Sequence, residues 1–292
     1  MINYSFIIPH KNCPDLLQRC VDSIPERDDV QIIVVDDNSN EGKKPQISRK
    51  GIEVILLDAE QSKGAGRARN VGLEHAKGKW LLFADCDDYY VSGFLDVLDN
   101  YRDEQVDVLY FNATQLHFSG KPVKSSLNKA IEDYFTEHTT NSLDFLKYRI
   151  HSPWNKMARK SFIDNYNILF EEVPNGNDTM FSYQVGFFAK KLEVISDKLY
   201  IYTMNRKSIT HRRRTSAILL SYLCNQRKQM RFSEFVGHKE WCREIDFKNY
   251  LKRLVKSLNI VDAFRVTYLY FSKKKIISSE ENMYVDLIKR RL

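Results

Sequence analysis

Short apolar runs alternate with helical patterns over about the first 100 residues of the 292-residue chain. Between the first two runs, apolar residues recur at helical spacing from Leu16 to Ile24, and Pro25 ends that pattern. A second helical pattern covers about residues 67–76. Such alternation of strand and helix predicts an α/β fold with a mostly parallel sheet flanked by helices. The predicted strands cover residues 5–9, 32–35, 53–57 and 80–83.

Polar residues follow three of these strands at the point where each strand ends. Parallel strands end at one edge of a sheet, where ligands gather, and we call this the carboxyl edge. Aspartates separated by one residue offer hard oxygen ligands for Mg²⁺ or Mn²⁺, and these ions suit a diphosphate. Asp-x-Asp occurs roughly once by chance in a chain of this length, so the motif indicates a metal site only together with the segments around it. The three strand ends read Pro9-His10-Lys11-Asn12, Asp36-Asp37-Asn38-Ser39 and Asp85-Cys86-Asp87-Asp88.

A glycine turn precedes the second helical pattern. A dinucleotide-binding fingerprint would need a third glycine where Arg69 stands, and the turn does not follow the first strand. The P-loop pattern is absent as well. Backbone amides at the helix start, together with Lys63, Arg67 and Arg69, suit a phosphate or the acidic carboxyl edge. The alternative is a solvated basic helix.

In this order, the segments resemble family 2 inverting glycosyltransferases with the GT-A fold, of the type that builds bacterial cell-surface polysaccharides. The resemblance covers about residues 1–210. It implies transfer of a sugar from a UDP-sugar donor to a hydroxyl of a glycan or lipid-linked glycan acceptor, with Mn²⁺ or Mg²⁺ as cofactor. The implied organisation is a GT-A (Rossmann-like) domain over 1–214, with a nucleotide-binding half (1–110) and an acceptor half (111–214), and a basic helical C-terminal region over 215–292.

The resemblance also implies individual roles at the carboxyl edge. Asp37 is similar to the carboxylate that hydrogen-bonds the uracil imide. Asp85 would face the ribose and base, and Asp87 would bind the metal that bridges the diphosphate. From the strand pattern alone we expect the Cys86 thiol to point into the core. The residues implied for nucleotide binding are Pro9, His10, Asn12, Asp37, Lys63, Gly64, Arg69, Asp85 and Cys86.

An inverting reaction needs a general base that takes the proton of the acceptor hydroxyl. The stretch that corresponds to the family's Glu-Asp pair reads Asn177-Asp178. Asp178 therefore fits the base, whereas Asn177 departs from the usual glutamate. A plain helix N-cap is the alternative role for Asp178.

The predicted acceptor half contains one aromatic segment and several polar stretches. Trp154, Asn155 and Lys156 resemble a segment near the acceptor site, where an aromatic ring stacks on a sugar. Packing of the tryptophan in the core is the alternative. Polar stretches within residues 112–150 predict loops around the acceptor cleft.

The segment from Tyr202 to His211 is similar to a family segment that closes over the donor phosphates. His211 would then reach the metal or a phosphate. The alternative is a surface histidine beside the arginines at 212–214.

Charge is distributed unevenly along the chain. Residues 1–197 carry 23 basic and 30 acidic residues, whereas residues 198–292 carry 22 and 8. The basic tail suits an anionic membrane surface, an acidic glycan, a helical cap with a solvated face, or a homodimer interface. No recognised nucleic-acid motif accompanies it, so we expect no nucleic-acid partner.

The expected location is the cytoplasm, peripheral on the inner face of the cell membrane if the tail binds lipid. No apolar run approaches a membrane span, and the N-terminus shows no signal peptide. The five cysteines are scattered without Cys-x-x-Cys spacing, which argues against a disulfide framework or a zinc site.

Two other classes of protein remain open. One is a catalytically inactive relative that binds a sugar nucleotide or a glycan, and turnover of a UDP-sugar would separate it from an enzyme. The other is a nucleotidyltransferase, which usually needs a glycine- and arginine-rich phosphate loop after the first strand. The chain has no glycine at that place, residues 9–12.

Overall fold

The computed structural model describes residues 1–204 except 118, together with 216–241, 264 and 267–268. The chain forms two compact units. The first contains Met1–Glu172 and Met180–Arg206, and the second contains Val173–Thr179 and Lys207–Leu292. The domain boundary predicted between 214 and 215 lies outside the described residues, as does most of the basic tail for which membrane and dimer contacts are predicted.

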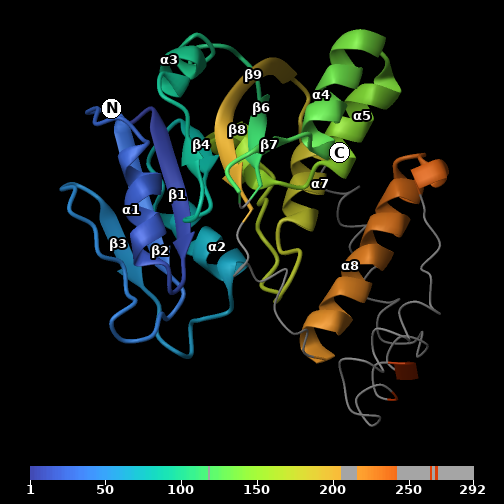
Figure 1. Ribbon diagram of the computed structural model, residues 1–292. Helices are drawn as coiled ribbons and strands as arrows, with labels where there is room; N and C mark the ends of the chain where they lie inside the picture. The colour runs from blue at the N-terminus through green and yellow to red at the C-terminus, as the bar shows by residue number, and fades with distance from the viewer. Residues whose placement is uncertain (118, 205–215, 242–263, 265–266, 269–292) are drawn as a thin grey trace. The chain divides into compact units, whose positions relative to one another are not determined.

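Parallel strands form the first half of the sheet in the first unit (Figure 1). β1 pairs in parallel with β2 and with β4, and β2 pairs in parallel with β3. Every residue of β1 and β4 is buried, as expected for apolar strands covered on both faces. The predicted strands are confirmed as β1 Tyr4–His10, β2 Val30–Asp36, β3 Glu53–Leu56 and β4 Trp80–Phe83.

The second half of the sheet is mixed. β8 runs antiparallel to both β4 and β6, β6 and β9 are parallel, and β5 is antiparallel to β9. Among the described residues the strand order is β3-β2-β1-β4-β8-β6-β9-β5, with β7 on β6. The α/β class is confirmed, with a mixed sheet. The added strands are β5 Tyr89–Tyr90, β6 Val108–Leu116, β7 Pro122–Val123, β8 Lys156–Arg159 and β9 Leu192–Thr203.

The two predicted helices follow their strands. α1 Pro14–Asp22 has proline in its first turn, where the missing N–H has no intrahelical partner to lose. α2 Ala65–His75 begins after Gly64, which has a φ of 88°, and packs against β1 and β2 (Figure 1). The other helices described in the first unit are α3 Phe94–Asp99, α4 Ser126–Glu137, α5 Thr140–Arg149, α6 Lys160–Asn165 and the 3₁₀ helix η1 Pro153–Asn155. Helix α7 covers Thr179–Phe188; its first residue belongs to the second unit and the others to the first.

Gly72 lets α2 lie close against β1. A Cβ at this position would lie 2.3 Å from Cγ2 of Ile7. Gly72→Ala should therefore destabilise the fold by about 1–3 kcal/mol, because the helix must move off the sheet. Urea unfolding followed by circular dichroism measures the change. Glu74→Ala, at an exposed position of the same helix, is the matched control, and an undiminished stability of Gly72→Ala would contradict this packing.

Of the loops predicted within residues 112–150, the one at residues 119–121 is present between β6 and β7, whereas helices α4 and α5 occupy most of residues 126–149. Each helix begins with a capping box. The Ser125 side chain accepts from the backbone N–H of Asn128, and Thr139 and Ser142 are paired in the same way. The usual sequence signature has Glu or Gln at the third helical position, and Asn and Ser stand there instead.

Aromatic side chains fill the core where β4 ends. The Phe83 ring lies edge-on to Phe170 and Phe181, with centroid distances of 5.1 and 5.4 Å. Phe170 and Phe181 stack on each other at 3.9 Å. Buried ring pairs of this kind stabilise a fold beyond their apolar area. This packing holds the end of β4, directly before the Asp85–Asp88 turn, in a fixed position.

The second unit contains the turn over residues 173–179, helix α8 Ser216–Phe235 and the 3₁₀ helix η3 Lys239–Trp241. The Asn175 carbonyl accepts hydrogen bonds from Ser221 Oγ at 3.0 Å and Asn225 Nδ2 at 2.5 Å. Gly176 has a φ of 69°, and a Cβ there would lie 1.9 Å from Asn225 Nδ2. Helix α8 thus fixes the turn before α7. Of the helices in the described part, none combines the length and apolarity that spanning a bilayer requires.

Candidate active site

The ends of β1 and β2 are joined by a buried pair. His10 Nδ1 lies 2.6 Å from Asp36 Oδ1, and Asp36 also accepts from the backbone and hydroxyl of Ser39. The backbone N–H of Cys13 donates to His10 Nε2 at 3.3 Å, so Nδ1 carries the proton given to Asp36. Burial lowers the pKa of His10, but hydrogen bonds with Cys13 and Asp36 outweigh it and leave that pKa raised. His10 therefore positions the segment 36–39.

This burial bears on the predicted nucleotide contacts of the first strand. Pro9 and His10 are both buried, whereas Asn12 is half-buried and has a φ of 58°. Asparagine tolerates this left-handed conformation. Asn12 Oδ1 accepts from the backbone of Asn40 at 2.8 Å, and the Asn12 backbone donates to Ser39 Oγ at 2.8 Å. Of the three residues, Asn12 is the one with exposed surface for a nucleotide.

Asp37 joins the end of β2 to the start of α2. One carboxylate oxygen accepts from Ser62 Oγ at 2.9 Å and from the Gly64 backbone at 3.0 Å. The other accepts from Lys11 Nζ at 2.9 Å. Sequence reasoning did not assign Lys11 or Ser62 a role, because their partner is distant along the chain. Together these contacts place Asp37 beside the N-terminus of α2.

Arg69 brings α2 to the acidic turn. Its guanidinium donates to Asp85 Oδ1 at 2.6 Å and lies 5.3 Å from the Phe170 ring centroid. The Asp85 side chain is 32% exposed, so it is open to solvent on one side. Lys63, at the start of the turn before α2, pairs with Glu172 at 3.0 Å and is exposed. Arg69 and Asp85 thus form a charged pair at the carboxyl edge.

The turn Asp85–Asp88 concentrates negative charge. Asp88 is buried and accepts from Tyr200 Oη at 3.1 Å and the Thr203 backbone at 2.7 Å, which makes it a support for the turn. Burial and the neighbouring Asp85 raise the pKa of Asp87 to about 6. A carboxylate in such a place gains from a nearby cation. In the described part of the chain, no three His, Cys, Asp or Glu side chains come together as a metal site.

The thiols of Cys13 and Cys86 meet at the same edge. Their sulfur atoms are 2.7 Å apart, and both residues are partly exposed. The prediction that the Cys86 thiol points into the core was wrong, because the turn after β4 directs it toward the start of α1. The hydrogen bond with Cys86 lowers the pKa of Cys13, whereas burial raises it. A hydrogen bond with His10 lowers it further, and the resulting pKa is about 5.

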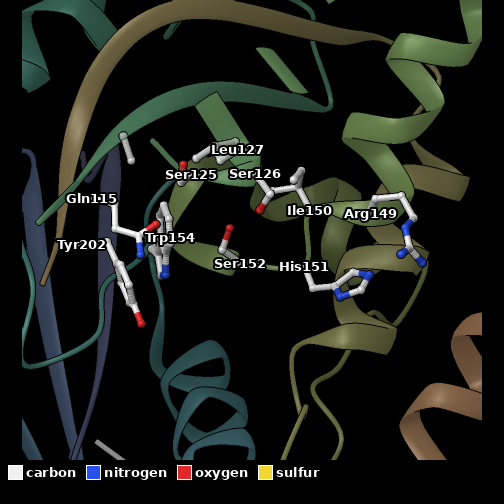
Figure 2. A pocket seen from close by; sticks show the side chains of 11 residues that line it. Gln115, Ser125, Ser126, Leu127, Arg149, Ile150, His151, Ser152, Trp154 and Tyr202 are labelled. Atoms are coloured by element: carbon white, nitrogen blue, oxygen red, sulfur yellow. The ribbon is translucent and has the colours of Figure 1, made fainter. Parts of the chain in front are cut away.

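A pocket of about 230 Å³ lies in the first unit and is lined by residues from Ala113 to Tyr202 (Figure 2). Gln115, Trp154 and Tyr202 stand at one side of it, and Arg149 and His151 at the other (Figure 2). The Trp154 ring stacks on Tyr200 at 4.9 Å and on Tyr202 at 5.7 Å. The remaining lining residues are Ala113, Ser125, Ser126, Leu127, Ile150 and Ser152.

Trp154 lines this pocket, but the two residues that follow it do not. Asn155 is 0% exposed and Lys156 is 2% exposed. The Lys156 ammonium donates to the carbonyls of Ile150 and Ser152 and to Asn155 Oδ1, at 3.3, 2.5 and 2.9 Å. A buried ammonium must be satisfied within the protein, so it braces the loop under Trp154. The predicted direct contact of Asn155 and Lys156 with an acceptor is therefore corrected to support of the pocket.

Asp178 stands in the turn of the second unit, directly before the first residue of α7. It is half-buried, as is Asn177 beside it. His211, predicted as a ligand of the metal or a phosphate, lies outside the described residues. The roles of Asp178 and His211 stay predictions.

Comparisons with known proteins agree on one family. The Glycosyl transferase family 2 model matches residues 5–166, more than half of the chain. The putative glycosyltransferase EpsH of Bacillus subtilis (strain 168) is 26% identical over 217 residues, which are 71% of this chain and 62% of EpsH. The GalNAc(5)-diNAcBac-PP-undecaprenol beta-1,3-glucosyltransferase of Campylobacter jejuni is 26% identical over 284 residues, 89% of each chain.

Among solved structures, S. aureus TarS 1–349 in complex with UDP-GlcNAc matches with a TM-score of 0.61 at 20% identity, over 99% of this chain and 89% of that one. This likeness confirms the predicted GT-A fold. The matched family segment runs from β1 into the residue after α6 and contains Asp37, Arg69, Asp85 and Asp87. Because the family model matches more than half of the chain, the chain belongs to glycosyl transferase family 2.

Proposed function

We propose that the chain transfers a sugar from a UDP-sugar donor to a hydroxyl group of a glycan or lipid-linked glycan, with a divalent metal and with inversion at the anomeric carbon. The observation that carries this proposal is the gathering of Asp37, Arg69, Asp85 and Asp87 at the carboxyl edge of parallel strands in a family 2 chain. Relatives named as glycosyltransferases and a fold neighbour bound to UDP-GlcNAc support the donor class.

The uracil ring would be recognised by Asp37. A carboxylate has about four acceptor positions, and Ser62, Gly64 and Lys11 take three of them. The position that remains suits the imide N–H of uracil, which cytosine lacks. Because three donors fix the carboxylate beforehand, little orientational freedom is lost when the base binds. Asn12 lies across the same edge and would contact the base or ribose.

The diphosphate would lie between α2 and the acidic turn. The N-terminus of α2 has no side-chain cap, so its first backbone N–H groups would be available to a phosphate, and Arg69 stands in its second turn. Asp87 would hold Mn²⁺ or Mg²⁺, which can be bound through one carboxylate when phosphate oxygens and water complete the shell. Asp85, already paired with Arg69, would face the ribose and base. When bound, the cation neutralises charge that builds on the departing diphosphate.

Asp178 would remove the proton from the acceptor hydroxyl. As this oxygen attacks the anomeric carbon from the face opposite the diphosphate, the configuration inverts. The Asp178 carboxylate lies in a turn fixed by Asn225 and Ser221 of α8, which limits its motion. Asn177, in place of the family's usual glutamate, adds no second charge beside it.

The pocket at Trp154 would receive the acceptor. Its volume of about 230 Å³ is of the order of one sugar residue, and it combines aromatic rings with serine hydroxyls and the Gln115 amide. Arg149, a basic residue in the last turn of α5, lines the same pocket. Burial, with Arg149 and Lys156 adding to it, lowers the pKa of His151 to about 4, so this histidine is neutral. The charge pattern favours an acceptor with an acidic group.

Trp154→Ala should raise the KM for the acceptor by about tenfold, because a ring that packs on the sugar is lost. Initial rates at saturating UDP-sugar against acceptor concentration measure this. Trp154→Phe keeps an aromatic ring and should show a smaller rise, and Trp241→Phe, in the second unit, is the control. An unchanged KM for Trp154→Ala would remove this pocket from the acceptor site.

Turnover tests the proposed function directly. The protein with Mn²⁺ is incubated with a panel of UDP-sugars and undecaprenyl-diphosphate-linked or phosphate-containing glycan acceptors, and released UDP and glycosylated product are measured. Product with inverted anomeric configuration supports the proposal. UDP binding without turnover of any donor would favour the inactive, sugar-nucleotide-binding relative instead.

A further inference from the structure

Cys13 and Cys86 form a pair of thiols that the proposed transfer does not use. Their sulfurs are 2.7 Å apart, although the residues are 73 positions apart in the chain. Both are partly exposed, whereas Cys20, the third cysteine whose surroundings are described in the first unit, is buried in α1. Two thiols in direct contact are the geometry from which a disulfide forms.

The segments that carry the two thiols also contact each other through Arg19. Cys13 directly precedes α1, and Arg19 of α1 donates to the backbone carbonyl of Asp87 at 2.5 Å. The Arg19 guanidinium also lies 4.6 Å from the ring centroid of Tyr89. Arg19 thus joins helix α1 to the acidic turn and to the first residue of β5. A disulfide bond is about 2.0 Å long, so the sulfurs need to approach by less than 1 Å.

We propose that Cys13 and Cys86 form a reversible disulfide that ties the start of α1 to the acidic turn. With a small-molecule disulfide such as oxidised glutathione as oxidant, the Cys13 thiolate attacks one glutathione sulfur and displaces a first glutathione thiolate. Cys86 then attacks the Cys13 sulfur of the mixed disulfide and displaces the second. The two cysteines lose two protons and two electrons, and the oxidant becomes two molecules of reduced glutathione. A dithiol such as dithiothreitol reverses both steps.

The bond would act on donor binding through its position. Cys86 stands between Asp85 and Asp87, so drawing its sulfur toward Cys13 moves the backbone that carries both carboxylates. Metal-binding geometry tolerates displacements of only about 0.5 Å. Oxidation should therefore weaken metal-dependent UDP binding by about tenfold, the size of effect seen when outer contacts of a metal site are lost. This effect rests on the proposed function, whereas the disulfide itself does not.

Peptide mapping tests the disulfide. Trypsin separates all three relevant cysteines, since Cys13 falls in peptide 12–19, Cys20 in 20–27 and Cys86 in 80–102. The folded protein is treated with oxidised glutathione, blocked with an alkylating reagent, digested and analysed by mass spectrometry. We expect peptides 12–19 and 80–102 joined with the loss of two hydrogens, and separate again after dithiothreitol. Cys20→Ala should give the same cross-link, and Cys13→Ser none. Absence of the cross-link in the wild-type protein would overturn the proposal.

Calorimetry of UDP with Mn²⁺ then tests the effect on binding. Oxidised wild-type protein should bind about tenfold more weakly than reduced protein, and Cys13→Ser should bind equally in both conditions. Unchanged affinity in cross-linked protein would overturn the regulatory effect. If reduced protein binds no UDP although the cross-link forms, the proposed function fails while the disulfide stands.

Discussion

Asp178→Asn is expected to lose sugar transfer by about 10²–10⁴-fold while donor binding is kept. Asparagine has the same shape but cannot take the proton of the acceptor hydroxyl, so the change acts on the transition state rather than on the bound donor. The measurement is kcat with saturating UDP-sugar and acceptor, paired with UDP affinity by calorimetry.

The control for this variant is Asp164→Asn, an aspartate on α6 with a partly exposed ion pair to Lys160. It removes one carboxylate of the same size and should leave kcat unchanged. A helix-cap role for Asp178 predicts a different outcome, since asparagine caps helices as well as aspartate does. Full turnover by Asp178→Asn would therefore move the base to another residue and leave Asp178 as a cap.

Asp87→Asn should abolish the Mn²⁺ dependence of UDP binding. The amide keeps the shape of the side chain but removes the charge that the metal needs, and the apo protein is relieved of repulsion between Asp87 and Asp85. The variant should thus fold at least as stably as the wild type while it loses metal-dependent affinity. Calorimetry with and without Mn²⁺, beside thermal unfolding, separates the two effects.

Asp96→Asn provides the comparison, because Asp96 is exposed on α3 and should have no part in the site. Mn²⁺-dependent binding should persist in it. If Asp87→Asn still binds UDP with the wild-type response to Mn²⁺, the metal assignment at the acidic turn is wrong and a different carboxylate must be sought.

The first half of the fold was predictable because β1, β4 and most of β2 are buried on both faces. Short continuous apolar runs such as Phe6–Ile8 and Trp80–Phe83 are typical of strands covered on both faces. The polar residues that follow these runs indicate the carboxyl edge. The second half gave weaker signals. Helices α4 and α5 begin with capping boxes that use Asn128 and Ser142, and antiparallel pairing of β8 brings together segments far apart in the chain.

The sequence predicted which residue types form the candidate site, but not which way their side chains point. Asp37, Arg69 and Asp85 lie together at the carboxyl edge, whereas their roles toward a nucleotide stay predictions. His10, Asn155 and Lys156 turn inward, because each finds partners there that a linear pattern does not show. The Cys13–Cys86 contact was missed for the same reason, since no Cys-x-x-Cys spacing marks a pair formed by two separate strand ends.

UDP binding measured by calorimetry with and without Mn²⁺, with GDP, CDP and ADP as competitors, decides whether the carboxyl edge binds a uridine diphosphate through a metal. The protein is held reduced so that Cys13 and Cys86 do not affect the result. Binding that prefers uridine and is lost on chelation is the predicted result, with Asp37 reading the base and Asp87 binding the metal. Absence of diphosphate binding, or binding indifferent to both base and metal, would contradict the account of this edge as a UDP-sugar site.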